Sequence, residues 1–129
     1  HPVLFERSIK KTLNFGRLSK VIVSSAKQTG RSIFPELKKI LRFPDWIKKY
    51  ENNNAFACHF SGKSKIKNIV NFKTDDIMII VGPEGDFSAS EIALLNASKV
   101  PLVNLGPRRL RTESACISSI LTTSDVIEG

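Results

Sequence analysis

The sequence has few cysteines, few aromatic residues and no long apolar run. The only cysteines are Cys58 and Cys116, which lie far apart and form no CxxC motif. Together with His1 and His59 they make no zinc motif of the usual spacing. We expect both cysteines to be small buried side chains in a reducing cytoplasm.

The apolar segments are too short to cross a membrane. The stretch Ile77–Val81 has the length of a strand, whereas a membrane-spanning helix needs roughly 18 apolar residues. The first residues also lack the apolar core of a secretory signal. The chain begins at His1 rather than Met, and we expect it to be a fragment of a longer protein. A length of 129 residues with 41% hydrophobic content predicts one compact domain.

The positive charge is concentrated in the first third of the chain. Up to Lys49 there are 12 Lys or Arg and 3 Asp or Glu, whereas from Tyr50 onward there are 8 basic and 9 acidic residues. Such a distribution is typical of a surface that faces a polyanion, and a solvated basic face is the alternative. With 8% aromatic residues, base-stacking platforms for single strands are not indicated.

Strands and helices are expected to alternate along the chain. Apolar segments predict strands at 2–5, 54–60, 77–81 and 100–105, and helical spacing predicts helices at 17–28, 44–50, 88–97 and from 112 to about 126. Ser88 and Glu91 have capping-box spacing, and Thr112 is a suitable N-cap. The alternation predicts an α/β fold with a mostly parallel sheet and helices on both of its faces.

Three loops follow predicted strands, namely Ser61–Lys65, Gly82–Asp86 and Gly106–Arg111. Ligands of open α/β sheets bind at the carboxyl ends of the strands, and glycine allows a ligand to approach the backbone closely. We therefore predict a small-ligand site built from these loops. For the second loop, a plain tight turn is the alternative.

The third loop carries Arg108, Arg109 and Arg111 directly before a predicted helix. Positive charge at a helix N-terminus is unfavourable with the helix dipole, so folding does not account for this arrangement. Glu113 in the first helical turn offsets the charge in part and is placed to pair with Arg111. The loop is a candidate functional site, with an exposed basic turn as the alternative.

The segments VGPEGDFSASEI and LGPRRLRTESA, separated by one helix and one strand, resemble the RsmE family of the SPOUT superfamily. Glu6-Arg7-Ser8, and Ser25–Arg31 followed by Pro35-Glu36, resemble further segments of that family, so the resemblance covers nearly the whole chain. Members of the family use S-adenosyl-L-methionine to methylate N3 of a uridine in 16S ribosomal RNA.

The resemblance implies a SPOUT-type sheet with a C-terminal trefoil knot and a cytoplasmic homodimer that acts on the small ribosomal subunit. It also implies that the knot loops hold the cofactor largely through backbone groups, with His59–Ser61 as the remaining wall and with no metal. The cofactor-binding residues would be Gly82, Glu84, Gly85, Leu105, Gly106, Leu110, Arg111 and Thr112.

Two residues depart from the family pattern. Asp86 stands where members usually have glycine, which puts a charge near the cofactor loop, and Ser114 stands where they commonly have threonine. Members also carry an N-terminal PUA-like domain and usually a βα unit before Glu6-Arg7-Ser8. We therefore expect residues 1–129 to be a SPOUT methyltransferase domain without the PUA-like domain and the first part of the catalytic domain.

The implied reaction needs a group that stabilises negative charge. N3 of uridine becomes nucleophilic only as its proton leaves and charge spreads onto the two flanking carbonyl oxygens, which a guanidinium can stabilise. Arg111 is the first candidate for this catalytic role and Arg109 the second. Glu113 is a possible base, but orienting Arg111 suits it better, since an exposed first-turn carboxylate has little reason to be basic.

Two other functions are weighed against this one. Ser61-Gly62-Lys63-Ser64 after a strand suggests a phosphate-binding loop, but Ala57 stands where such a loop needs its first glycine. The second alternative is a catalytically inactive knotted module for RNA binding or dimerisation. The intact arginine-rich third loop argues against that alternative.

Overall fold

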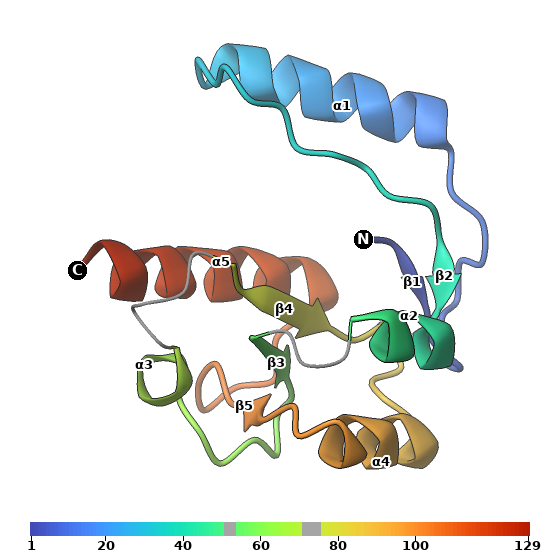
Figure 1. The fold of residues 1–129 in the computed structure, drawn as a ribbon, viewed down its shortest axis with the longest axis vertical. Helices are drawn as coiled ribbons and strands as arrows, with labels where there is room; N and C mark the ends of the chain where they lie inside the picture. The colour runs from blue at the N-terminus through green and yellow to red at the C-terminus, as the bar shows by residue number, and fades with distance from the viewer. Residues whose placement is uncertain (51–53, 71–75) are drawn as a thin grey trace.

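The computed structural model describes residues 1–50, 54–70 and 76–129, which form two parallel sheets with helices packed around them (Figure 1). In chain order the elements are β1 (Val3–Leu4), α1 (Phe15–Gln28), β2 (Leu41–Arg42), α2 (Phe43–Lys49), β3 (Ala55–Cys58), α3 (Ile66–Ile69), β4 (Met78–Val81), α4 (Ala89–Ala97), β5 (Leu102–Val103) and α5 (Thr112–Glu128). The α/β class and the parallel pairing predicted from the sequence are confirmed.

The larger sheet has the strand order β4-β3-β5, with all neighbours parallel. Ala57 pairs with Ile80 on one side and with Leu102 on the other, so β3 lies in the centre. Three successive residues of β3, Phe56, Ala57 and Cys58, are buried. Since side chains alternate between the faces of a strand, both faces of this sheet are covered.

Two apolar clusters cover the two faces. The first cluster joins Ala57 and Ile80 of the sheet to Phe43 of α2 and Leu95 of α4. Phe87, in the loop before α4, belongs to the same cluster. The second is built from buried Phe56, Cys58, Ile66, Val70 and Val103, with Val126 of α5 packed against it. Helices α2 and α4 contact each other on one side, and α3 and α5 contact each other on the other, so helices cover both faces as predicted.

The smaller sheet pairs β1 with β2 in parallel, with Val3 opposite Leu41. It joins the first core through Phe5, whose ring centroid lies 5.0 Å from that of Phe43. Helix α1 lies between the two strands in the sequence and stands apart from the sheets in Figure 1. Ala26 is the buried residue of this helix.

The structure corrects the sequence prediction in three places. The predicted N-cap Thr112 is the first residue of α5, and the N-cap is Arg111, whose side chain makes no capping bond. Helix α3 and strand β2 were not predicted, because four and two residues are too short to show a period. The capping box of Ser88 and Glu91 is confirmed, with both of its hydrogen bonds formed.

The remaining predicted elements are present with shifted ends. The strand predicted at 100–105 is reduced to Leu102–Val103, and the helix predicted at 17–28 begins two residues earlier, at Phe15. Asn14 caps that helix, since its Oδ1 accepts from the backbone N–H of Arg17 at 3.0 Å. Within the described residues, no helix is both long and apolar enough to cross a membrane.

Candidate functional site

The three loops predicted to form a site meet around one cavity. Because β3, β4 and β5 are parallel neighbours, their carboxyl ends lie at the same edge of the sheet. The cavity there has a volume of about 530 Å³. Its lining residues are Cys58, His59, Phe60, Val81, Gly82, Pro83, Glu84, Asp86, Asn104, Leu105, Arg108, Arg109, Leu110, Arg111, Thr112, Glu113 and Ala115.

Most of the predicted site residues line this cavity. The catalytic candidates Arg109, Arg111 and Glu113 all lie in its wall. Six of the predicted cofactor-binding residues do so too, namely Gly82, Glu84, Leu105, Leu110, Arg111 and Thr112. Gly85 and Gly106, the other two, are not among the lining residues.

Packing explains the glycine at position 85. A Cβ atom on Gly85 would lie 2.9 Å from the Cβ of Arg7 and 3.3 Å from its carbonyl oxygen, closer than normal contact. At Gly106, by contrast, an added Cβ would meet no atom within 4 Å. The backbone N–H of Gly106 donates to Oδ1 of Asn104 at 2.8 Å. Space beside the third loop is therefore open, whereas the second loop is closed against Arg7.

The second loop is tied to the start of α5 at the cavity wall. Oγ1 of Thr112 donates to the carbonyl oxygen of Gly82 at 3.2 Å, which joins the start of α5 to the end of β4. Gly82 is packed against the ring of Phe87, because an added Cβ would lie 3.3 Å from it. The hydroxyl that was expected to cap a helix therefore fixes the distance between two loops.

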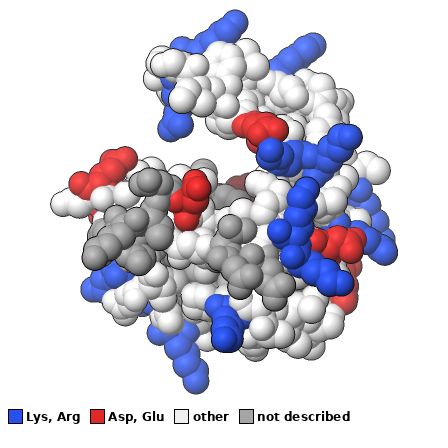
Figure 2. Space-filling model, viewed as in Figure 1, with Lys and Arg blue, Asp and Glu red and all other residues white. Residues whose placement is uncertain are grey.

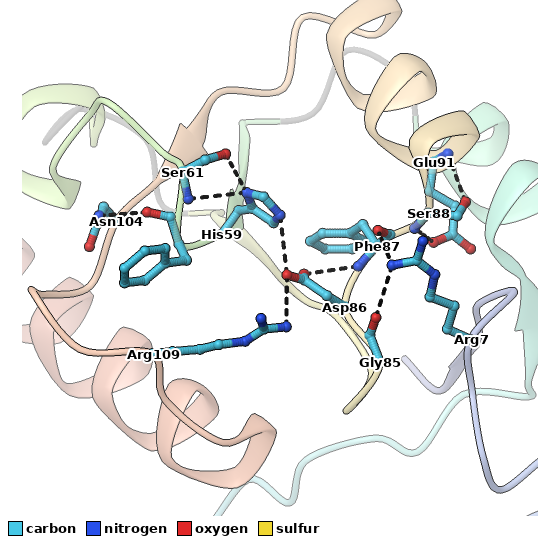
Figure 3. Close-up of polar contacts among 11 residues, drawn as sticks. Arg7, His59, Ser61, Gly85, Asp86, Phe87, Ser88, Glu91, Asn104 and Arg109 are labelled. Atoms are coloured by element: carbon cyan, nitrogen blue, oxygen red, sulfur yellow. Dashed lines mark hydrogen bonds and ion pairs between the residues drawn. The ribbon is translucent and has the colours of Figure 1, made fainter.

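Arg7, which is not among the residues lining the cavity, holds the second loop through two hydrogen bonds (Figure 3). Its Nη1 donates to the carbonyl oxygens of Gly85 at 3.1 Å and of Phe87 at 3.3 Å. The segment Glu6-Arg7-Ser8, noted in the sequence only for its resemblance, thus acts as a support for this loop.

Glu91 joins the same segment to α4. Its side chain is 2% exposed, and it accepts from the backbone N–H of Glu6 at 2.7 Å and of Ser88 at 2.8 Å. The carboxylate of Glu6 in turn accepts from Oγ of Ser90 at 2.6 Å. Hydrogen bonds from Ser90 and Ser88 lower the pKa of Glu6 below its ordinary value. These bonds fix β1 beside the loop that leaves β4.

His59, Asp86 and Arg109 connect the three loops inside the cavity. Oδ2 of Asp86 lies 3.3 Å from Nε2 of His59 and 3.2 Å from Nη2 of Arg109 (Figure 3). Asp86 has a φ of 64°, a left-handed conformation that glycine adopts without cost. The sequence marked Asp86 only as a charge near the loop and did not predict these contacts.

The arginines differ in their surroundings. The side chain of Arg109 is 65% exposed and is held by Asp86. The pairing that the sequence suggested between Glu113 and Arg111 is not formed among the described residues, whose ion pairs do not include these two. Arg111 is exposed at the N-cap of α5, and within the described residues no ion pair involves its guanidinium.

Asn104 and Cys58 are among the lining residues that the sequence analysis missed. Nδ2 of Asn104 donates to the carbonyl oxygen of Phe60 at 2.7 Å, so Asn104 links the first loop to the third. Cys58 is 8% exposed, and burial raises the pKa of its thiol to about 11. Asn104 could have been noticed as an asparagine near the end of a predicted strand. Cys58 could be assigned to the site only once the position of the cavity was known.

The geometry disfavours a phosphate-binding loop at Ser61–Ser64. A Cβ on Gly62 would lie 2.6 Å from the carbonyl carbon of Val103 and 2.7 Å from the backbone nitrogen of Asn104. Glycine is therefore required here because two backbones pack closely, and this close contact occupies the space where a phosphate would have to approach.

Comparison with known proteins agrees with this arrangement. A model of the RNA methyltransferase domain family matches residues 1–124. Ribosomal RNA small subunit methyltransferase E of Rickettsia conorii is 34% identical over 113 residues, which cover 85% of this chain and 46% of that protein. The protein of the same name from Aquifex aeolicus is 34% identical over 126 residues, which cover 92% of this chain and 53% of that protein. The chain spans about half the length of these curated relatives.

Solved structures agree as well. Ribosomal RNA small subunit methyltransferase E from Neisseria gonorrhoeae, bound to S-adenosyl methionine, matches with a TM-score of 0.88 and 25% identity over 97% of this chain and 53% of that one. A Legionella pneumophila methyltransferase with bound cofactor matches with a TM-score of 0.83 and 25% identity. The match covers 96% of this chain and 53% of that one. The resemblance seen in the loop motifs is confirmed, and the chain belongs to the RNA methyltransferase domain family, among relatives named ribosomal RNA small subunit methyltransferase E.

Proposed function

We propose that this domain methylates N3 of a uridine in 16S ribosomal RNA, with S-adenosyl-L-methionine as the methyl donor. The observation that carries the proposal is the cavity of about 530 Å³ at the carboxyl ends of β3, β4 and β5, lined by three arginines of one loop. The names of the relatives in Rickettsia and Aquifex and the cofactor in the Neisseria structure support it.

The cavity fits the proposed cofactor in size and chemistry. Pockets for ligands of this size are roughly 300–1,000 Å³ and mostly apolar, with a few polar groups that fix orientation. Leu105 and Leu110 supply apolar surface, and the backbone of Gly82 lies in the wall without a side chain. Glu84 brings negative charge to the same wall, which suits the cationic sulfonium and the ammonium group of the cofactor.

The residues around the cavity would each have a distinct task. When bound, S-adenosylmethionine supplies a methyl group on a positively charged sulfur. Arg111, unpaired among the described residues, is free to stabilise the anion that forms on the uridine oxygens as N3 loses its proton. Arg109, two residues earlier in the same loop, would also contact the base. Glu113 remains the candidate to orient Arg111 or to take the proton once RNA excludes water.

RNA would approach over the basic first third of the chain. Figure 2 shows Lys and Arg side chains over α1 and along the side that carries β2 and α2. Residues 1–49 hold 12 of the 20 basic residues. Neutralisation of phosphates by such side chains supplies affinity that does not depend on sequence.

We also propose a cytoplasmic homodimer and a C-terminal trefoil knot. On α5, Ile117, Ile120 and Leu121 are 62%, 58% and 64% exposed, which is a large apolar surface for one helix. A symmetric dimer would cover it with the same helix of a second copy. Light scattering should give twice the monomer mass for the wild type and the monomer mass for Ile120→Glu. A wild-type monomer at about tens of micromolar would contradict the dimer.

Calorimetric titration separates the functions under consideration. S-adenosylmethionine should bind with one site per chain, whereas ATP should not bind. An ATP isotherm without one for S-adenosylmethionine would favour the phosphate-loop function. RNA binding with no response to either compound would favour the inactive module.

A further inference from the structure

Asp86 is the point at which all three loops of the cavity meet. One oxygen of its carboxylate, Oδ2, contacts Nε2 of His59 at 3.3 Å and Nη2 of Arg109 at 3.2 Å. The side chain is 25% exposed, so it lies within the wall rather than in open solvent. Figure 3 shows Asp86 between the other two side chains.

The backbone of Asp86 is in a conformation that few side chains favour. Its φ is 64°, which glycine adopts freely and which Asp and Asn tolerate better than most other residues. Oδ1 accepts from the N–H of Phe87 at 2.9 Å, and this bond supports the turn. A residue kept in a strained conformation at a ligand cavity indicates that its side chain has a task there.

The hydrogen bonds of His59 fix which ring nitrogen carries the proton. The backbone N–H of Ser61 donates to Nδ1 at 3.3 Å, so Nδ1 acts as an acceptor. Oγ of Ser61 lies 2.7 Å from the same nitrogen and can donate to it in this tautomer. The neutral ring therefore carries its proton on Nε2 and donates it to Asp86. His59 holds the carboxylate on one side, and the carboxylate holds Arg109 on the other.

Without this contact Arg109 would be a long, mobile side chain, since it is 65% exposed. Its Nη2 is bound to Asp86, which directs the guanidinium across the cavity wall and leaves its other N–H groups for a substrate. Charge stabilisation in a transition state depends on such prior placement.

We propose that Asp86 is a positioning residue for the methyl transfer, holding Arg109 at the cavity wall where its guanidinium contacts the carbonyl oxygens of the target base. This inference rests on the proposed function. It gives Arg109 a role in substrate placement that depends on Asp86, and it accounts for an aspartate in a conformation suited to glycine.

Kinetics of four variants test the proposal. In Asp86→Gly the backbone keeps its conformation and the carboxylate is lost, whereas Asp86→Asn keeps the shape and loses the charge. Both should lower kcat about 10-fold or more, as expected when a catalytic group is displaced, with the Kd for S-adenosylmethionine within about 3-fold of wild type. Arg109→Ala should lose a similar factor, and Asp86→Gly combined with Arg109→Ala should be no slower than Arg109→Ala alone.

Two further measurements distinguish positioning from a structural role. Asp86→Gly should unfold close to the wild-type temperature, because relief of the left-handed backbone offsets the lost bond from the Phe87 N–H. Nitrogen-15 chemical shifts of the His59 ring should show the Nε2–H form in both the wild type and Asp86→Gly, because the bond from the Ser61 N–H to Nδ1 remains, whereas a structural role for Asp86 would disturb this form. Asp125→Asn, at an exposed position near the end of α5, removes the same charge far from the cavity and should leave both measurements unchanged.

Two failures can be told apart. If the wild type neither binds S-adenosylmethionine nor methylates RNA, the proposed function falls and this inference with it. If the wild type is active and Asp86→Gly turns over at the wild-type rate, only the inference is overturned. The inference would also be overturned if kcat of the combined variant fell by the product of the factors lost in Asp86→Gly and Arg109→Ala. The two residues would then act independently.

Discussion

Arg7 and Gly85 are 78 positions apart in the sequence, and Nη1 of Arg7 donates to the carbonyl oxygen of Gly85 at 3.1 Å. A second bond from the same atom reaches Phe87 at 3.3 Å. The segment that follows β1 thereby supports the loop that leaves β4, and the cavity depends on a residue that does not line it.

Arg7→Ala should therefore weaken both folding and cofactor binding. Loss of two hydrogen bonds from a charged donor should lower the free energy of unfolding by about 1–3 kcal/mol, measured by urea denaturation. The affinity for S-adenosylmethionine should fall severalfold, because the loop at 82–87 is no longer held. Arg17→Ala, on exposed α1, removes the same charge and serves as the control. Equal behaviour of the two variants would remove the role assigned to Arg7.

Glu91→Ala should destabilise the domain strongly. The buried carboxylate accepts from the backbone N–H groups of Glu6 and Ser88, and alanine would leave both donors without a partner. The expected loss in the free energy of unfolding is about 2–4 kcal/mol. Glu91→Gln keeps one acceptor oxygen and should lose less. Glu128→Ala, at the exposed end of α5, should change little by thermal denaturation.

The thiol of Cys58 should be unreactive at neutral pH. Burial raises its pKa from 9.0 to about 11, which lowers the thiolate fraction at pH 8 about 100-fold. In Cys116→Ser, iodoacetamide should therefore label Cys58 far more slowly than the unfolded chain in urea. Similar rates in the two states would contradict this burial.

The same shift predicts how stability depends on pH. Since the folded pKa of Cys58 lies above the unfolded value, the folded chain retains the thiol proton at a pH where the unfolded chain loses it. This contribution is present in full below pH 9.0 and is lost as the pH rises to about 11. Cys58→Ala should show a smaller decrease in stability across that interval.

Replacement of Lys10, Lys11 and Arg17 by Gln should weaken RNA binding and reduce its salt dependence. If each contacts one phosphate, the slope of log K against log salt should become less steep by about 2–3. A matched triple replacement of Lys63, Lys67 and Lys99 removes equal charge from the remainder of the chain. Equal slopes for the two variants would indicate that binding depends on net charge alone.

The sequence predicted the helices and strands that have a hydrophobic period or a helix-capping residue. It also predicted the edge of the sheet where the loops meet. Helix α4 was recognisable because Ser88 and Glu91 satisfy its first turn reciprocally. Strands β1 and β5 have two residues each, and hydrogen bonding to neighbours defines them rather than any pattern of their own. Their extent therefore could not be read from local sequence.

The composition of the site was predictable, but its internal contacts were not. Parallel strands bring their carboxyl ends together, so Arg109 and Arg111 could be assigned to one cavity in advance. The bond from Thr112 to Gly82 and the contact between Asp86 and His59 depend on distances between loops far apart in the sequence. The hydrogen bond that Glu91 accepts from the backbone N–H of Glu6 could not be predicted either, because the two residues are far apart in the sequence.

We propose that this domain transfers a methyl group to N3 of uridine, with Arg111 stabilising the developing anion. The most direct test supplies small-subunit RNA and S-adenosylmethionine with a labelled methyl group, followed by nucleoside analysis. Label should appear in 3-methyluridine, and Arg111→Ala should cut the single-turnover rate about 10²-fold or more at saturating cofactor, with little rescue by Arg111→Lys. Label in another nucleoside, or none at all with cofactor and RNA bound, would contradict the account.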